Sequence, residues 1–147
     1  MRRHLATAVL VLFSGFASHA QSGGSQNVLN ANAVTEGELL PLPHMTPALA
    51  KAIVGHRPFK TVRDLDALLQ PLSRQQRAEL YGRLFVPINL NTATDAEILT
   101  IPGLGQRMLR EFKEYRPYKS IEQFRREIGK YVSRQEVARL ERYVSLD

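Results

Sequence analysis

Residues 101–107 read Ile-Pro-Gly-Leu-Gly-Gln-Arg and hold the residue types best suited to binding an anion. Gly103 and Gly105 let the backbone turn through conformations closed to other residues, and they place no side chain between the backbone and a ligand. The amide N–H groups of such a turn, and of the first turn of the next helix, face a position where the helix dipole favours negative charge. A phosphate oxygen fits a nest of this kind. The segment therefore predicts a phosphate-binding turn between two helices.

Side chains beside this turn extend the candidate site. Leu104 is expected to fill the space between the two flanking helices and hold the turn rigid. Gln106 begins the second helix, and Arg107 and Arg110 lie three residues apart on it, so both arginines can flank one phosphate. Such contacts add charge without reading base edges, which predicts binding that is independent of sequence. Spacing alone leaves open a second interpretation, in which the glycines only make a tight turn.

An internal repeat organises the chain. Asn89 and Asn91 repeat Asn30 and Asn32 at a constant offset. At the same offset, the sequence Arg-Pro-Phe-Lys that begins at position 57 returns as Arg-Pro-Tyr-Lys at position 116. One extra residue then shifts the alignment. A match across the whole unit predicts two copies. Their expected bounds are residues 28–86 and 87–147.

Each copy is expected to contain about four short helices. Ser or Thr with an acidic residue or Gln three positions later is a capping box, which satisfies the free amides at a helix start. Thr35 with Glu38 and Thr94 with Glu97 form such boxes at the first helix of each copy. Pairs at the same spacing mark later helix starts: Thr61 with Asp64, Ser73 with Gln76, Ser120 with Gln123, and Ser133 with Glu136. Prolines such as Pro102 and Pro117 end the preceding helices. No stretch alternates with a period of two, so the predicted fold is all-α, a tandem of helix-hairpin-helix repeats.

The first copy departs from the phosphate-binding pattern. Its segment 43–47 reads Pro-His-Met-Thr-Pro, so both glycines are absent, and Pro47 has no N–H group to offer. His44 can bind an anion when protonated, but a single loop histidine more often has no role. We therefore expect the first copy to be a structural or protein-binding partner of the second.

The sequence shows no pattern typical of an enzyme. It contains no cysteine, and His44 and His56 have no carboxylates spaced to complete a metal site or a catalytic triad. Carboxylates mostly stand at helix starts or in mixed-charge segments such as residues 111–114. The expectation is a protein that is not an enzyme and has no metal and no cofactor.

The first residues have the pattern of a secretory signal peptide. Arg2 and Arg3 precede an apolar run from Leu5 to Phe16, and small residues lead to a cleavage site after Ala20. The run is shorter than the ~20 residues of a membrane-spanning helix. We expect a signal peptide over residues 1–20, a flexible leader over 21–27, and a periplasmic or secreted protein without a membrane span. Cleavage leaves 18 basic against 14 acidic residues, a net charge of +4, which permits a nucleic-acid partner.

Residues 89–105, residues 115–118 and Ile121 together resemble the helix-hairpin-helix domain of the ComEA-type competence DNA receptors. The resemblance implies an exported, all-α module that binds the backbone of double-stranded DNA without sequence preference during DNA uptake in natural transformation. It also implies a second, weaker hairpin at residues 128–132, where Gly129 alone keeps the glycine pattern and Lys130 makes a supporting phosphate contact.

Degenerate copies of the same motif resemble another kind of protein, the small extrinsic subunit of photosystem II, whose hairpins pack against proteins. That resemblance implies the alternative, an exported protein-interaction module with little or no DNA binding. Residues 28–86 would then contact an envelope protein partner. The glycines at 103 and 105 favour the DNA-binding interpretation, and their absence from the first copy favours the alternative.

Overall fold

The structure is a computed structural model that describes residues 27–147. The predicted signal peptide, residues 1–20, and all but the last residue of the predicted leader lie outside the described residues. Within residues 27–147, no helix is both long enough and apolar enough to cross a membrane.

The same order of elements occurs twice along the described chain. The N-terminal half, residues 27–86, contains β1 (Leu29–Asn30), α1 (Glu36–Leu39), α2 (Pro47–Gly55), α3 (Val62–Leu68), α4 (Arg74–Tyr81) and β2 (Leu84–Phe85). The C-terminal half, residues 87–147, contains β3 (Ile88–Asn89), α5 (Asp95–Ile98), α6 (Gln106–Glu114), α7 (Ile121–Ile128), α8 (Arg134–Leu140), a 3-10 turn (Glu141–Tyr143) and β4 (Val144–Ser145). The chain is thus helix-rich, with four short helices in each half as expected.

Helix starts follow the predicted capping residues. Thr94 is the N-cap of α5: its hydroxyl accepts from the amide of Glu97, and its own amide donates to the Glu97 carboxylate at 2.8 Å. Thr35 and Glu38 make the same reciprocal pair at the start of α1, with an amide-to-carboxylate distance of 2.8 Å. These bonds supply partners for amides that have none inside the helix, so the capping-box prediction is confirmed at both positions.

The described chain is helix-rich, as expected, but it is not helical throughout, because four short strands form two parallel pairs. In the N-terminal half β1 pairs with β2, Leu29 opposite Leu84. In the C-terminal half β3 pairs with β4, Ile88 opposite Val144. Each strand has only two residues, too few to produce a visible alternation. The pairs join the beginning of each half to its end.

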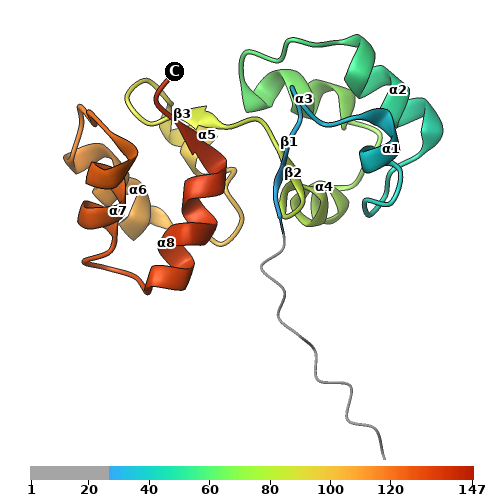
Figure 1. The fold of residues 1–147 in the computed structure, drawn as a ribbon. Coiled ribbons are helices and arrows are strands. Elements are labelled where there is room, and N and C mark those ends of the chain that lie inside the picture. Colours follow the sequence, from blue (N-terminus) through green and yellow to red (C-terminus); the bar gives the residue numbers. More distant parts are fainter. Residues whose placement is uncertain (1–26) are drawn as a thin grey trace, which may run out of the picture.

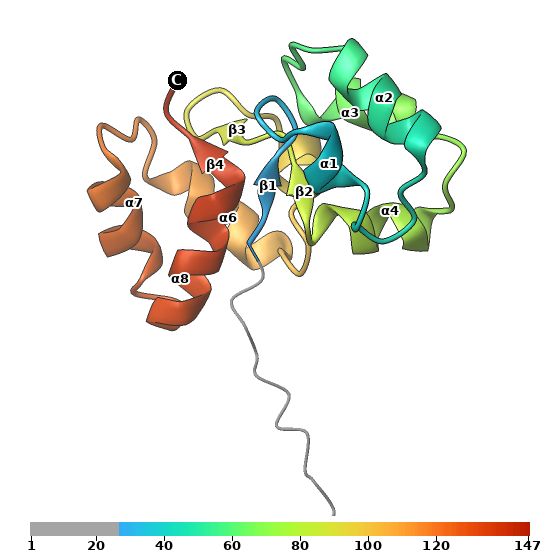
Figure 2. The ribbon, with the colours of Figure 1, turned by 45° about the vertical axis from the view of Figure 1, so that its right-hand side comes forward.

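The two groups of helices lie on either side of the strands, α1–α4 in one group and α5–α8 in the other (Figures 1 and 2). One continuous cluster of buried apolar side chains runs through both halves. At their junction the ring of Phe85 packs edge-on against that of Tyr143, with centroids 4.9 Å apart. The buried hydroxyl of Tyr143 donates to the carbonyl of Tyr81 at 3.1 Å. The halves therefore pack against each other through apolar contact.

Two repeated polar residues hold loops together inside each half. The amide of Asn91 donates to the carbonyl of Tyr118 at 2.9 Å, and its oxygen accepts from the Tyr118 N–H at 2.7 Å. The guanidinium of Arg116 donates to the carbonyls of Leu90, at 2.6 Å, and Ala93, at 2.8 Å. The corresponding bonds of the N-terminal half come from Asn32, to Phe59, and Arg57, to Ala31 and Val34. These repeated residues therefore have a structural role.

Candidate nucleic-acid interface

The turn at residues 101–105 connects α5 to α6 and has the shape that its glycines predict. Gly103 has a φ of +76°, in the left-handed region that favours glycine. The amide of Leu104 donates to the carbonyl of Ile101 at 3.1 Å, which closes the turn. The side chain of Leu104 is only 8% exposed and belongs to the apolar core. Leu104 is thus buried in the core, as expected of a residue that fills the space between two helices.

The helix that follows this turn has an unusual N-terminus. Seven of the eight α-helices in residues 27–147 begin after a Ser or Thr N-cap, whereas α6 begins after Gly105. Gly105 has no side chain to accept from the first-turn amides, and the space around its missing Cβ is open. The amides of Gln106 and Arg107 lie in that first turn, on an exposed segment. This N-terminus therefore leaves room for an external acceptor.

The predicted basic residues lie along the same exposed surface. Arg107 and Arg110 are both exposed on α6. The guanidinium of Arg107 lies 5.9 Å from the centroid of the Tyr131 ring, in the range of a cation–π contact. Because Tyr131 belongs to the turn between α7 and α8, this contact joins the start of α6 to that turn.

Lys130 lies at the same junction. The hydroxyls of Tyr115 and Tyr131 are 2.7 Å apart, and the ammonium of Lys130 lies 5.2 Å from the centroid of the Tyr115 ring. Lys130 also pairs with Glu127, which lowers the pKa of that carboxyl and raises the pKa of Lys130. The structure thus brings Lys130 and Arg107 to one pair of tyrosines, although the charge of Lys130 is partly balanced by Glu127.

Arg139 is a candidate that the sequence did not predict. Its guanidinium lies 3.7 Å from the place that a Cβ atom on Gly103 would occupy. It donates twice to the carboxylate of Glu136, at 2.8 and 2.7 Å, and this pairing raises the pKa of Arg139. Arg139 lies beside Gly103 because α8 packs near the turn. The two residues are far apart in the sequence, so their spacing does not predict that they are neighbours.

The corresponding turn of the N-terminal half, between α1 and α2, is closed by its own side chains. His44 has a φ of +60°, and its Nε2 lies 2.6 Å from a carboxylate oxygen of Glu79. This bond lowers the pKa of Glu79. The hydroxyl of Thr46, the N-cap of α2, accepts from the amide of Leu49 at 3.2 Å, and Pro47 takes the first helical position. The first helical position of α2 therefore has no N–H group and its third amide is capped, whereas no side chain caps the first-turn amides of α6.

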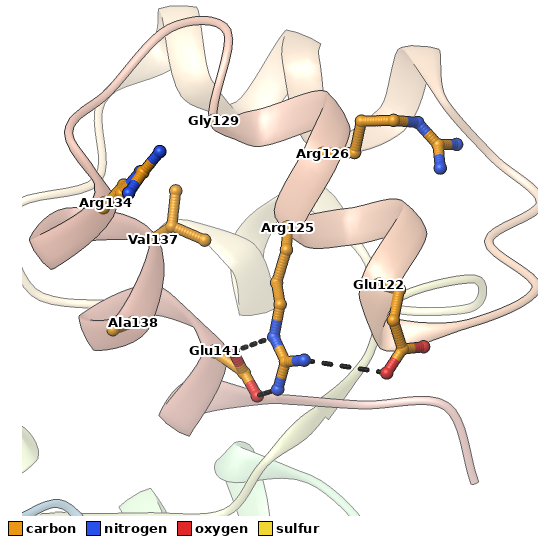
Figure 3. A pocket seen from close by; sticks show the side chains of 8 residues that line it. All are labelled: Glu122, Arg125, Arg126, Gly129, Arg134, Val137, Ala138 and Glu141. Carbon is orange, nitrogen blue, oxygen red and sulfur yellow. Dashed lines mark hydrogen bonds and ion pairs between the residues drawn. The ribbon is translucent and has the colours of Figure 1, made fainter.

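A separate pocket of about 520 Å³ lies between α7 and α8 (Figure 3). Arg125 reaches across it to Glu141, at 2.5 Å, and lies 3.6 Å from Glu122. Arg134, the first residue of α8, also lines it. The charge of Arg125 is balanced by two carboxylates, and none of residues 101–105 lines this pocket. In residues 27–147 no group of three or more His, Asp or Glu side chains is placed to hold a metal ion.

The relatives that match this chain are curated proteins named "Endonuclease/exonuclease/phosphatase family domain-containing protein 1". The protein of Bos taurus is 30% identical over 142 residues, that of Xenopus laevis 30% over 133, and that of Homo sapiens 28% over 140. The alignments cover 67% of this chain and 25%, 24% and 25% of these relatives, respectively. The chain thus spans about a quarter of their length. No protein-family model and no solved structure matches the chain.

These relatives correct three expectations. The identification as a ComEA-type competence protein is wrong, because the matching relatives carry a different name. The functions drawn from such resemblances, DNA uptake and its alternative of an exported protein-interaction module, are contradicted by the same finding. The expectation that the chain is not an enzyme is contradicted as well, because its relatives are named after a family of endonucleases, exonucleases and phosphatases. A short turn motif occurs in proteins of different function and cannot tell them apart. An alignment over two thirds of the chain compares many more residues.

Proposed function

We propose that this chain binds the phosphate backbone of double-stranded DNA for a phosphoester-cleaving reaction of the endonuclease, exonuclease and phosphatase class. The reaction class comes from the names of its relatives. The binding role is supported by one observation above all: α6 begins after a glycine, so its first-turn amides have no capping side chain. The proposal assigns the surface at the start of α6 one part of the reaction, the holding of the nucleic-acid substrate.

The residues proposed to contact phosphate lie along α6 and the two turns of the C-terminal half. Gly103 and Gly105 supply close approach, and the amides of Gln106 and Arg107 supply hydrogen-bond donors. The side chains of Arg107, Arg110 and Lys130 add positive charge around this point, while the buried Leu104 holds the turn in shape. None of these groups reads a base edge, so the proposed binding is independent of sequence.

We also propose that the two halves are copies of one helix-hairpin-helix unit, residues 28–86 and 87–147. The repeated order of elements supports this division, as do the matching bonds of Asn32 and Asn91. His44 and Gly103 occupy the same place in their turns, and both have a left-handed backbone conformation. This agreement also supports the division into two copies. In this proposal the second copy keeps the open turn and the first has a capped one.

A salt titration tests the proposed binding. With few phosphate contacts, the dissociation constant for a 20-base-pair fluorescent duplex should be about 10⁻⁴–10⁻⁶ M at physiological salt and much lower in dilute buffer. Two duplexes of unrelated sequence should bind alike by fluorescence anisotropy. Arg107→Ala should weaken both equally and lower the slope of log K against log salt by about one. Absence of binding in dilute buffer would exclude the proposed function.

Cleavage of the same duplex tests the link to the reaction. The labelled strand is followed on a denaturing gel with a divalent cation added, for the wild-type chain and Arg107→Ala. If the chain holds the substrate, then the cleavage rate at subsaturating DNA falls by the factor by which Arg107→Ala weakens binding. An unchanged rate in a variant that binds more weakly would separate this surface from the reaction.

A further inference from the structure

A groove of about 320 Å³ lies where the N-terminal half meets the turn at residues 101–105. One wall is α4, which contributes Arg74, Arg77 and Tyr81. The other wall is the phosphate-binding turn itself, including Pro102 and Gly103. The groove therefore runs directly into the backbone that the proposed function assigns to phosphate.

The charge of this groove is positive. Arg74 is exposed at the first position of α4 and makes no ion pair within residues 27–147. The guanidinium of Arg77 lies 3.6 Å from the carboxylate of Asp66, and the side chain of Arg77 is 22% exposed. Asp66 also accepts a hydrogen bond from the hydroxyl of Tyr81 at 2.6 Å, so its charge is shared between two partners. Arg74 is thus the cation in this groove that has no carboxylate partner among the described residues.

The position of Arg74 relative to the turn is fixed by the packing between the halves. α4 ends at Tyr81, whose carbonyl accepts from the Tyr143 hydroxyl, and the following Phe85 packs against the Tyr143 ring. The edge-on contact of Tyr81 with Phe85, centroids 5.6 Å apart, ties the end of α4 to this junction. The groove is therefore formed by packed side chains on both sides.

We infer that Arg74, with Arg77 beside it, forms a second phosphate site, which binds the same DNA strand next to the phosphate held at Gly103 and Gly105. This inference rests on the proposed function. A guanidinium presents several donors to phosphate oxygens and keeps its charge at every physiological pH. The N-terminal half then contacts the nucleic acid through the basic face of α4, while its own capped turn does not.

The ligand is an internal phosphodiester of the duplex, because the groove continues from the open turn at Gly103. A terminal phosphate has the same chemistry, so the test separates the two sources. Blunt duplexes of one sequence, with and without 5′-phosphates, are titrated against the same variants. An internal site is affected equally in both duplexes. A loss confined to the 5′-phosphorylated duplex would overturn the assignment to an internal phosphodiester.

Arg74→Gln is the decisive variant, and Arg134→Gln is its matched control. Arg134 occupies the first position of α8 as Arg74 does in α4, and both are exposed. Arg134 lines the separate pocket between α7 and α8 (Figure 3). Both variants remove one positive charge from the net total, so a difference between them reports position. Arg77→Gln is less informative, because it also leaves Asp66 without its cation.

We expect Arg74→Gln to weaken binding of the 20-base-pair duplex about threefold to tenfold and to lower the salt slope by about one. Arg134→Gln should change neither by as much. Equal effects of the two variants would overturn the inference, while wild-type binding and its loss in Arg107→Ala would leave the proposed function standing. If the wild-type chain binds no duplex in dilute buffer, the proposed function fails, and this inference fails with it. Circular dichroism and thermal melting show that each variant is folded.

Discussion

Arg139 lies beside Gly103, its guanidinium 3.7 Å from the place of a missing Cβ atom. The aligned positions of the N-terminal half hold Glu79 and His44, which bond to each other at 2.6 Å. At these two positions the C-terminal half has an arginine beside a glycine backbone. The N-terminal half has a histidine bonded to a glutamate. This exchange gives the C-terminal turn the more positive surroundings.

Arg139→Gln removes the cation nearest Gly103. We expect duplex binding to weaken about threefold to tenfold and the salt slope to fall by about one, because one phosphate-facing charge is lost. The pair with Glu136 is partly exposed and lies within one helix, so it contributes little stability, and the melting temperature should change by no more than a few degrees. Arg126→Gln on α7, whose side chain is 66% exposed, is the matched control. Equal effects of the two variants would rule out a role for Arg139 at the turn.

Phe85→Ala tests the junction between the halves. Phe85 is fully buried and contacts the rings of Tyr81 and Tyr143. We expect the free energy of unfolding to fall by about 3–5 kcal/mol in urea titrations, the usual cost of removing a buried phenyl group. Tyr143→Phe removes only the hydroxyl that donates to Tyr81, so its cost should be about 1 kcal/mol. A Phe85→Ala loss below that of Tyr143→Phe would contradict a packed junction.

The pH dependence of stability follows from the carboxylates that accept charged hydrogen bonds. Hydrogen bonds from Arg125 hold the pKa of Glu141 below its ordinary value of 4.5. A lowered pKa in the folded chain means that the ionised group stabilises the fold above pH 4.5, and that this contribution is lost as the pH falls through the folded value. Urea titrations between pH 7 and pH 3 should show this loss. Glu141→Gln should make the dependence shallower, and an identical pH profile in the variant would refute the assignment.

Much of the fold could be predicted from local residue patterns. Thr94 with Glu97 marks a helix start because the two side chains satisfy amides within one turn of chain, and the same holds for Thr35 with Glu38. Gly103 predicted a left-handed turn because few other residues accept that backbone. The paired strands escaped prediction, since two residues are too short for a period to appear.

The candidate site could be predicted only in part, because some of it comes from contacts between distant elements. Gly105, Arg107 and Arg110 lie close together along the chain, so their spacing was enough. Arg139 approaches the turn from α8, and Arg74 lines the groove beside the turn from the other half. No periodicity in the sequence encodes such contacts.

The protein class could not be predicted from the turn at all. The resemblance to competence receptors came from residues that build a glycine turn between two helices and its supporting loops. Arg116, one of the residues that carried it, bonds to the carbonyls of Leu90 and Ala93. Such residues report the architecture of the unit, which unrelated functions share.

The uncapped start of α6 is proposed to bind phosphate. The capped start of α2 provides the matched control, because the opposite substitution can be made there. Gly105→Thr places at α6 the N-cap that Thr46 provides at α2, and both the φ of −102° and the open space around Gly105 accept a side chain. Thr46→Gly removes the cap of α2, where Pro47 still offers no N–H.

Fluorescence anisotropy of the 20-base-pair duplex in dilute buffer, with melting temperatures measured in parallel, decides the question. We predict that Gly105→Thr binds at least about tenfold more weakly, because its hydroxyl takes the amide of Met108, as Thr46 takes that of Leu49, and its side chain obstructs phosphate at the amides of Gln106 and Arg107. A hydrogen bond to a charged acceptor is worth about 1.5–3 kcal/mol. Its stability should hold or rise by a few tenths of a kcal/mol, and Thr46→Gly should bind as the wild type does. Binding of the duplex by Gly105→Thr at wild-type affinity would contradict the account.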